Sequence, residues 1–365
     1  MDLFNKNKIE MLSGVTVIND NALAVQILKS DAFSVINIVD YLRKLESGSG
    51  LNFKKLIEFT SNSPFFIEGD KHSNIKKLFS NALGKTNINI WQPSFEDKIE
   101  VLTRDFKHHA QTDLMNYCFD ISKTLLRPII FGTETEVPDD FEKRLYNFQK
   151  IAEPLLPIRQ LVKLEGEIEY LLSCIKNCLD HSTECIPHSL RYYLNDEATA
   201  DLSDDDKIML LMIVYGAKTP LIQTLANIFL DILVNHKTDF FNSGVFNEQY
   251  FHTQIDEILD KAASLLHIHR VAVKDFSCHD INIKEGDVVL IRIGSSAENQ
   301  CPHHKNLSFG LRTHYCSGAM MSKTIICGVV PAFFKVYPHV MAQTWEYDSS
   351  IHTARALITL KVILE

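Results

Sequence analysis

Residues 308–319 read SFGLRTHYCSGA and place Cys316 between Gly310 and Gly318, with Phe309 close by in the sequence. Glycine lets a loop approach a bound group closely because it carries no Cβ, and an aromatic ring keeps water away from a sulfur. The eight cysteines of the chain show no paired C-x-x-C spacing, so a zinc cluster is not expected. Cys316 therefore has two interpretations: an ordinary buried thiol, or a ligand presented by a glycine-rich loop.

The second interpretation gains from a family resemblance. The stretch resembles the haem-ligand loop of cytochromes P450, F-G-x-G-x-H-x-C-x-G, and the residues that match it in register are Phe309, Gly310, His314, Cys316 and Gly318. The resemblance implies haem b (iron protoporphyrin IX) with the Cys316 thiolate on the iron and the other four residues around the cofactor. The pattern departs at Arg312, where the family prefers glycine, and at residues 321–323, where it prefers Leu-Ala-Arg.

Two further segments resemble the parts of the family that hold the haem propionates. Arg270 follows Glu257 by 13 residues, the spacing that the family has between a helix glutamate and a propionate-binding arginine. His72 and Lys76 resemble the family's H-x-x-x-R, and their i, i+4 spacing places both on one helix face. Taken alone, His72 and Lys76 are also consistent with an ordinary solvated surface. The resemblance implies that His72, Lys76, Arg270 and His314 bind the propionates.

A long apolar helix is predicted over residues 204–234. Ser203 is suited to cap it, and its apolar residues run nearly all round, which is typical of a helix at the centre of a large protein. The segment 215–220, YGAKTP, resembles the family's A-G-x-[D/E]-T-[T/S] over the oxygen-binding face of the haem. Pro220 has no N–H, so it frees the Gly216 carbonyl and opens the helix beside Thr219.

The resemblance implies catalytic roles for Gly216, Lys218 and Thr219, with the Thr219 hydroxyl as the hydrogen-bond donor toward bound oxygen. Lys218 stands where the family has an acid that helps to relay protons. Either Lys218 relays protons with a lowered pKa, or its side chain points away from the haem.

The proximal side of the haem departs further from the family. Glu257 and Asp260 occupy the E-x-x-R positions, and Asp260 cannot form the bidentate pair that an arginine would form with the glutamate. The connecting segment 298–308 is short and contains no arginine. Because both arginines of the family's network are missing together, the sequence predicts a rebuilt proximal side.

Length and composition predict a single domain over residues 1–365, mainly α with small β-sheets, and the resemblance implies the cytochrome P450 fold. Helices are predicted at 34–45, 72–83, 94–107, 112–131, 139–152, 164–182, 187–194 and 204–234. Strands are predicted at 269–276, 281–294, 329–338 and 353–364. The formal net charge of −9 argues against a nucleic-acid partner. No apolar run approaches the roughly 20 residues of a membrane span, and the N-terminus shows no signal peptide, so a cytoplasmic location is expected.

The leading hypothesis is a P450 monooxygenase that oxidises a small-molecule or carrier-bound substrate in natural-product metabolism. Electrons would come from a ferredoxin-type or flavodoxin-type donor, drawn to a basic patch formed by Lys76, Lys77, Lys305, Arg312 and Lys323. The alternatives are a peroxide-using or non-oxidative haem-thiolate enzyme, and a non-catalytic P450-like binding protein. Residues expected near the substrate are 61–69, 152–162, Tyr215, 263–266 and the C-terminal turn near Trp345.

Overall fold

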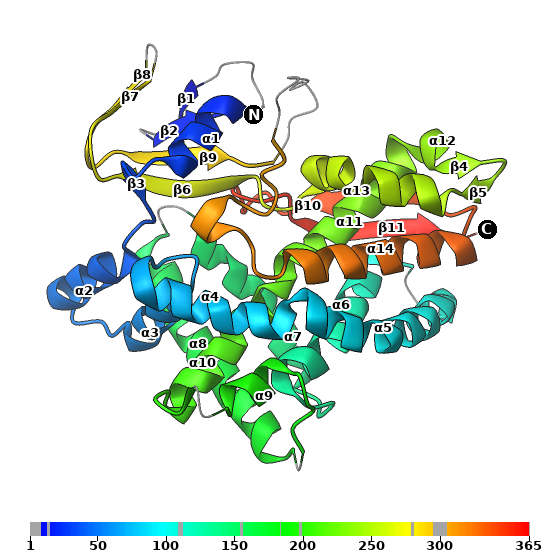
Figure 1. Cartoon of the computed structure of the whole chain (residues 1–365), viewed down its shortest axis with the longest axis horizontal. Coiled ribbons are helices and arrows are strands. Elements are labelled where there is room, and N and C mark those ends of the chain that lie inside the picture. Colours follow the sequence, from blue (N-terminus) through cyan, green and yellow to red (C-terminus); the bar gives the residue numbers. More distant parts are fainter. Residues whose placement is uncertain are drawn as a thin grey trace.

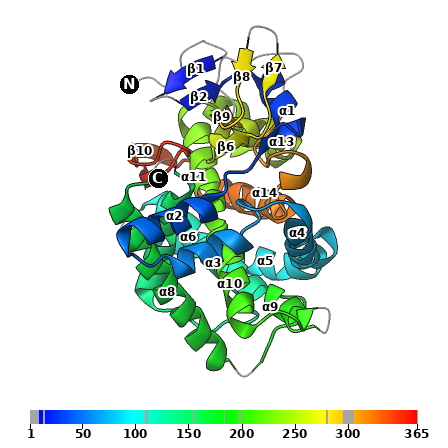
Figure 2. The same ribbon diagram turned by 90° about the vertical axis from the view of Figure 1, so that its left-hand side faces the viewer.

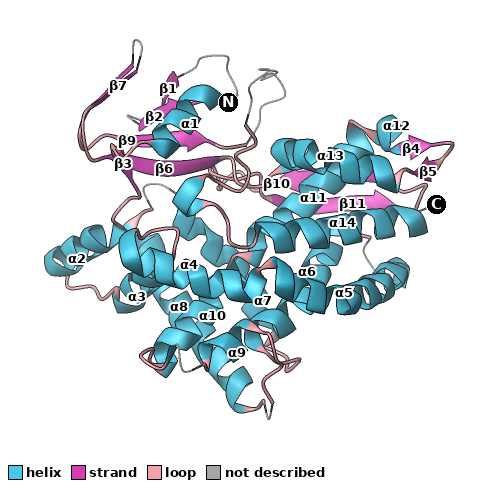
Figure 3. Ribbon diagram, viewed as in Figure 1, coloured by secondary structure: helices cyan, strands magenta, loops and turns pink. Residues whose placement is uncertain are grey.

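The computed structural model describes residues 9–12, 15–108, 112–153, 156–182, 184–196, 199–278, 281–294 and 305–364. Most of the short connecting segment predicted at 298–308 lies outside these residues. The fold class predicted from the sequence, mainly α with small sheets, is confirmed (Figure 3). The extent of a single domain over the whole chain stays a prediction.

Helices form the larger part of the molecule (Figure 1). Their bounds are α1 Asn21–Lys29, α2 Ile38–Ser49, α3 Lys54–Asn62, α4 Gly69–Leu83, α5 Lys85–Asp105, α6 Leu114–Phe131, α7 Asp139–Phe148, α8 Ile158–Asp180, α9 Leu190–Leu194, α10 Asp204–Gly216, α11 Lys218–Val234, α12 Lys237–Phe240, α13 Glu248–Ala262 and α14 Ala319–Val336.

Small sheets complete the fold. The strands are β1 Ile9–Leu12, β2 Val15–Ile18, β3 Phe33–Ser34, β4 Phe241–Asn242, β5 Val245–Phe246, β6 His267–Ala272, β7 Phe276–Cys278, β8 Ile281–Ile283, β9 Val288–Arg292, β10 Met341–Tyr347 and β11 Leu357–Ile363. The largest sheet has the order β1-β2-β9-β6-β3 and lies at one end of the molecule, as Figure 1 shows. In it β6 and β9 are antiparallel, and β2 and β9 are parallel.

The predicted central helix is present but interrupted. Ser203 caps α10 by accepting a hydrogen bond from the Asp206 N–H, as expected. α10 ends at Gly216, Ala217 forms the joint, and α11 begins at Lys218. The break lies within one turn before Pro220, where the proline lacks the N–H that would bond residue 216.

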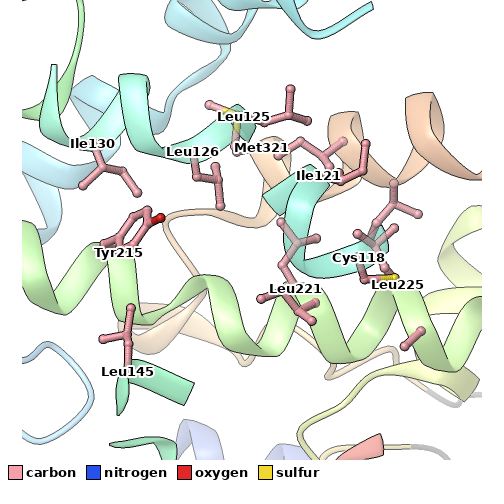
Figure 4. Packing of buried hydrophobic residues seen from close by; sticks show 14 of the residues in the cluster. Cys118, Ile121, Leu125, Leu126, Ile130, Leu145, Tyr215, Leu221, Leu225 and Met321 are labelled. Atoms are coloured by element: carbon pink, nitrogen blue, oxygen red, sulfur yellow. The ribbon is translucent and has the colours of Figure 1, made fainter. Parts of the chain in front are cut away.

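The two central helices run through the middle of the protein (Figure 2). α11 packs against α6, α13 and α14. Figure 4 shows apolar side chains of α6, among them Ile121, Leu125 and Leu126, facing Leu221 and Leu225 of the central helix. Burial on nearly all faces explains why these helices are apolar all round.

One predicted strand is wrong. Residues 329–338 lie mostly in α14, which contains Pro331 and buries Val329, Val330, Phe333 and Phe334. A short run of valines and phenylalanines looks the same in a buried strand and in a buried helix, and length alone separates the two. The strand predicted at 281–294 is divided into β8 and β9, and the strand predicted at 269–276 corresponds mainly to β6. The other predicted elements are present with shifted ends. α5, for example, begins at Lys85 and continues through Pro93, well before the predicted start at residue 94.

Two stretches of helix are long and apolar enough to cross a membrane by composition alone. They are Asp204–Val234 and Ala319–Val336, and in the fold 78% and 50% of their most apolar windows are buried. Packing inside the protein accounts for their apolar character.

Candidate functional site

A cavity of about 460 Å³ lies between the broken central helix and the loop that carries Cys316. This size is within the usual range for small-molecule and cofactor sites. All the site residues predicted from the sequence line it: His72, Lys76, Gly216, Lys218, Thr219, Arg270, Phe309, Gly310, His314, Cys316 and Gly318. The fold therefore brings together segments that are separated by up to 246 residues (318 − 72).

The Cys316 loop turns sharply to direct the thiol into the cavity. Gly310 has φ +74°, and a Cβ there would lie 2.8 Å from the His314 carbonyl oxygen, so glycine is required. The Cys316 N–H donates to the Phe309 carbonyl over 2.7 Å, closing the turn. Desolvation raises the pKa of the Cys316 thiol, while the Gly318 N–H and the Lys76 ammonium favour the thiolate. The loop can present a sulfur ligand to a metal in the cavity.

Arg312 departs from the family's glycine but keeps a glycine-like backbone. Its φ is +54°, in the left-handed region that non-glycine residues seldom occupy. Its guanidinium donates to the Lys29 carbonyl at the end of α1. This contact stabilises an arginine at a position where the backbone conformation favours glycine.

Buried cationic and imidazole groups gather at one end of the cavity. His72 is 3% exposed, and within the described residues its Nε2 has no hydrogen-bond partner. Its ring centroid lies 4.5 Å from that of His314. Arg270 is 8% exposed and donates to the carbonyl of His269 over 2.7 Å. The Glu68 carboxylate lies 3.5 Å from His314 Nε2.

Desolvation is the largest cause of the pKa shifts in this cluster, and the Glu68 carboxylate opposes it only in part. Burial lowers the pKa of His72 and of Arg270. Burial, with repulsion from Arg270 and His72, lowers the pKa of His314 to about 4. Buried donors of this kind are stabilised by an anion. The cationic end of the cavity therefore suits the two carboxylates of a haem, and the Cys316 sulfur is placed to bind the iron.

Lys76 occupies a different place from the other three predicted propionate ligands. Its Nζ donates to the carbonyl of Thr313 over 2.6 Å and to the carbonyl of Tyr315 over 2.5 Å. The ammonium thus bonds to the backbone on both sides of His314, next to Cys316.

The distal wall is formed at the break between α10 and α11. Thr219 is 2% exposed and lines the cavity together with Gly216. Lys218 also borders the cavity, but its ammonium pairs with the Glu142 carboxylate of α7 and lies 4.0 Å from the Tyr215 ring centroid. The Tyr215 hydroxyl donates to the other oxygen of Glu142 over 2.7 Å. Burial lowers the pKa of Lys218 to about 8, although Glu142 opposes the shift.

The structure shows how the proximal side is built without the family's arginine pair. On α13, Glu257 pairs with Lys261 over 2.6 Å rather than with residue 260. The loop is attached to α13 by Asn306, which donates to the Asp256 carbonyl over 2.7 Å, and by Ser308, which donates to the Leu259 carbonyl over 3.0 Å.

Sequence reasoning missed three residues that support the site. Glu142 partners Lys218, Asn306 attaches the loop to α13, and Arg355 donates to the Lys261 carbonyl at the end of α13. Glu142 and Arg355 are far in sequence from the groups that they contact, so no local pattern could have found them.

Several predicted pocket residues line the cavity and others do not. Residues 63–66, Ala152 and Ala263–Leu265 line it, as predicted. The Tyr215 ring does not, because it is fully buried against Phe131 at 4.5 Å. Trp345 lies on strand β10 and is 44% exposed, away from the described cavity lining. These two predictions are wrong because a local sequence pattern does not show which way a side chain faces.

Three members of the predicted basic patch are already engaged. Lys76 bonds to loop carbonyls, Arg312 to the Lys29 carbonyl, and Lys323 pairs with Asp256 over 2.5 Å. Lys77 and Lys305 are exposed. Because, among the described residues, only two of the five predicted members have side chains free of such contacts, the patch is weaker than predicted from the sequence.

Comparisons with known proteins agree with this geometry. No family model matches the chain. The chain is 22% identical over 356 residues to 2-hydroxy-5-methyl-1-naphthoate 7-hydroxylase of Streptomyces carzinostaticus, covering 91% of this chain and 84% of the relative. It is 21% identical over 316 residues to the polyketide biosynthesis cytochrome P450 PksS of Bacillus subtilis, covering 80% and 74%.

Solved structures share the fold over almost the whole chain. P450BioI in complex with a hexadec-9Z-enoic acid ligated acyl carrier protein has a TM-score of 0.78 at 16% identity, covering 98% of this chain and 95% of the other. Epothilone B-bound P450epoK has a TM-score of 0.73 at 16% identity, covering 98% and 94%.

A cysteine loop that faces a broken central helix across an apolar cavity, with buried cationic groups at one end, is the arrangement of a haem-thiolate protein. The chain belongs to the cytochrome P450 superfamily. One relative is named as a hydroxylase and another as a polyketide biosynthesis cytochrome P450, so the chain is assigned to the P450 monooxygenases, and membership implies a haem cofactor.

Proposed function

We propose that this P450 oxidises an apolar small molecule, free or attached to a carrier protein, in the biosynthesis of a natural product. The observation that supports this most is the position of Thr219 and the helix break across the cavity from Cys316. In the net reaction one oxygen atom of dioxygen enters a C–H bond of the substrate. The other leaves as water, and two electrons and two protons are consumed.

The residues present fit haem b. The Cys316 thiolate would bind the iron, and His72, Arg270 and His314 would bind the propionates. When bound, the haem supplies the one-electron and dioxygen chemistry that amino-acid side chains cannot perform.

The chain's own residues prepare that chemistry in three ways. Phe309 belongs to the cysteine loop and lines the cavity together with Cys316, where its ring would shield the sulfur from water. The Gly318 N–H donates to the sulfur and stabilises the thiolate. The Thr219 hydroxyl lies on the opposite wall, at the opened turn of the central helix, where it can donate a hydrogen bond and pass a proton into the cavity. Apolar residues around both walls exclude bulk water.

The lining of the cavity supports an apolar substrate. Away from the cationic end it is formed mostly by Phe59, Phe65, Phe66, Leu145, Phe148, Ile151, Met212 and Ile213. Apolar lining favours an uncharged substrate because burying an unpaired charge is costly. Relatives named for polyketide biosynthesis, and a neighbour solved with an acyl carrier protein, support a natural-product and carrier-bound substrate.

A ferredoxin-type or flavodoxin-type protein is the proposed electron donor, docking at the exposed Lys77 and Lys305. A cytoplasmic location is part of the same proposal. Basic groups favour an acidic donor. Because Lys77 and Lys305 are exposed, salt screens their attraction, so binding of the donor should weaken as the salt concentration rises.

A second candidate function has one observation in its favour. Lys218 replaces the family's acid, and its ammonium is paired with Glu142. An enzyme that receives its oxygen as hydrogen peroxide needs less proton delivery from this position, so a peroxide-using haem-thiolate enzyme is the alternative.

The test begins with the full chain loaded with haem. We expect the ferrous–CO spectrum to show the red-shifted band of a thiolate ligand. A ferredoxin system with NAD(P)H should then support oxidation of a panel of apolar and acyl-carrier-bound compounds. Failure to bind haem contradicts the proposal, and turnover with hydrogen peroxide alone selects the second candidate.

A further inference from the structure

We propose that Lys76 is a positioning residue that holds the Cys316 loop, a task distinct from binding a propionate. Its ammonium bridges the carbonyls of Thr313 and Tyr315, and so braces the 313–314 and 315–316 peptide units on either side of His314. The expected effect on thiolate ligation rests on the proposed haem-thiolate function. The bracing of the loop rests only on contacts within the chain.

The placement of Lys76 follows from α4. His72 and Lys76 are one turn apart on the same face of this helix, which borders the cavity. The His72 ring contacts His314 with a centroid separation of 4.5 Å. The Lys76 side chain is longer and reaches the backbone on either side of that histidine. The two residues therefore contact the same loop at different atoms.

Among the described residues, two other polar side-chain contacts hold the middle of the loop: Arg312 with the Lys29 carbonyl, and His314 with Glu68. Lys76 differs from both because it bonds directly to the loop backbone. Residues 312–314 form a single short turn, and Gly310 and Arg312 both have positive φ. Thr313, Tyr315 and Cys316 are exposed, although Cys316 is exposed toward the cavity. The described backbone hydrogen bonds here are Gly310 to Leu307, Tyr315 to Arg312 and Cys316 to Phe309. Loops with few internal hydrogen bonds open locally at low cost.

Among the described residues, the hydrogen bonds from α13 end before this part of the loop. Asn306 and Ser308 tie its entrance to α13, before Phe309. At residue 312 the Arg312 side chain reaches the Lys29 carbonyl. Lys76 supplies charge-assisted bonds at residues 313 and 315, and such bonds are about twice as strong as neutral ones. In a chain without the family's E-x-x-R arginine, Lys76 braces the loop from the opposite side.

If Lys76 braces the loop, its loss and the loss of a propionate ligand should have different effects, one on loop stability and the other on haem retention. Loss of Lys76 should loosen the loop whether or not haem is present, and should release the thiolate from part of the haem-loaded molecules. Loss of Arg270, a cavity-facing cation with no contact to the loop backbone among the described bonds, should weaken haem retention and leave the loop unchanged.

The experiment compares Lys76→Met with the matched control Lys77→Met, which changes an exposed lysine on the same helix, and with Arg270→Met. The first measurement is amide hydrogen exchange of the full chain with and without haem. We expect the protection of the Tyr315 and Cys316 amides to fall roughly 10- to 100-fold in Lys76→Met, the factor expected for a hydrogen bond to a charged group. The controls should keep it.

The second measurement is the ferrous–CO spectrum at equal haem content. Lys76→Met should shift a large part of the red-shifted band to the blue-shifted band of a lost thiolate, and Lys76→Arg should recover it because a guanidinium can also bridge two carbonyls. If Lys76→Met does not fold, Lys76→Gln takes its place with the same expectation, because glutamine is polar but lacks the charge and the length with which the lysine bridges the two carbonyls.

Unchanged loop protection and an unchanged band, together with haem loss as fast as in Arg270→Met, would overturn the proposal and make Lys76 a propionate ligand. If the wild-type chain binds no haem, the proposed function fails. The exchange measurement on the haem-free chain then still decides whether Lys76 holds the loop.

Discussion

The two walls of the cavity are held in place by different means. The distal wall is a pair of helices whose side chains are buried on almost every face, so packing fixes the backbone around Thr219. The proximal wall is a loop that depends on individual hydrogen bonds from α1, α4 and α13. Because of this difference, a substitution on the proximal side should mainly change the position of the sulfur ligand. A substitution on the distal side should mainly change the stability of the fold.

Replacement of the sulfur ligand should have the largest effect. Cys316→Ala should abolish the red-shifted ferrous–CO band completely, because Cys316 is the cysteine that lines the cavity among the described residues. Cys327→Ala on α14 is the matched control and should keep the band. A band that survives in Cys316→Ala would show that another residue binds the iron.

Breaking the buried Lys218–Glu142 pair on the distal side should lower the free energy of unfolding and leave the thiolate ligation of the haem unchanged. Glu142→Gln leaves the Lys218 ammonium buried without its carboxylate, and loss of one partner of a buried pair costs about 3–5 kcal/mol. Because the Glu142 side chain is 18% exposed, we expect the lower end of this range. Urea unfolding at pH 7 measures it, and the CO band of the folded protein should not move. A neutral result would mean that the pair is not formed in solution.

The same pair predicts a pH dependence. The pKa of Lys218 is lowered from 10.5 in the unfolded chain to about 8 in the folded protein. Between these values the unfolded chain binds a proton that the folded chain has released, so this lysine makes the stability rise as the pH rises from about 8 toward 10.5. Unfolding curves at several pH values should show this rise in wild type and Lys77→Met, and lose it in Lys218→Met. Equal slopes in all three would contradict the shift.

On the proximal side, haem retention should depend more on Arg270 than on His72. An arginine can make two charge-assisted bonds to a carboxylate, each contributing about 1.5–3 kcal/mol when shielded from water. We expect Arg270→Ala to lose haem roughly tenfold or more faster than wild type in transfer to apomyoglobin, and His72→Ala to show a smaller change. Equal rates in the two variants would remove this ranking.

The smallest effect is expected at Thr219. Thr219→Ala should leave fold, haem content and CO band intact, because it removes one neutral hydroxyl from a packed helix. Electron use should be less well coupled to product, by several-fold, since a single hydrogen bond contributes about 1 kcal/mol. Peroxide released per NAD(P)H oxidised measures this. Thr224→Ala, also in the cavity lining on α11, is the control. Identical peroxide release would favour the peroxide-using alternative.

Much of the site could be predicted because its chemistry is local in the sequence. The turn around Cys316 requires Gly310 at a positive φ, and the break beside Thr219 follows from the missing N–H of Pro220. The strand predicted at 329–338 failed for the opposite reason. Valine and phenylalanine suit a buried strand or a buried helix equally, and the neighbours of α14 decide between them.

The sequence by itself determined the family, the mainly helical fold and the candidate haem-binding and catalytic residues that line the cavity, because these depend on short patterns of residue type and spacing. Only the tertiary structure decided the partners of the charged side chains. Lys218 pairs with Glu142, which is 76 residues away, and Lys76 bonds to Thr313 and Tyr315, which are 237 and 239 residues away. A long flexible cation carries no local signal for its acceptor, and the acceptor exists only once distant segments have packed together.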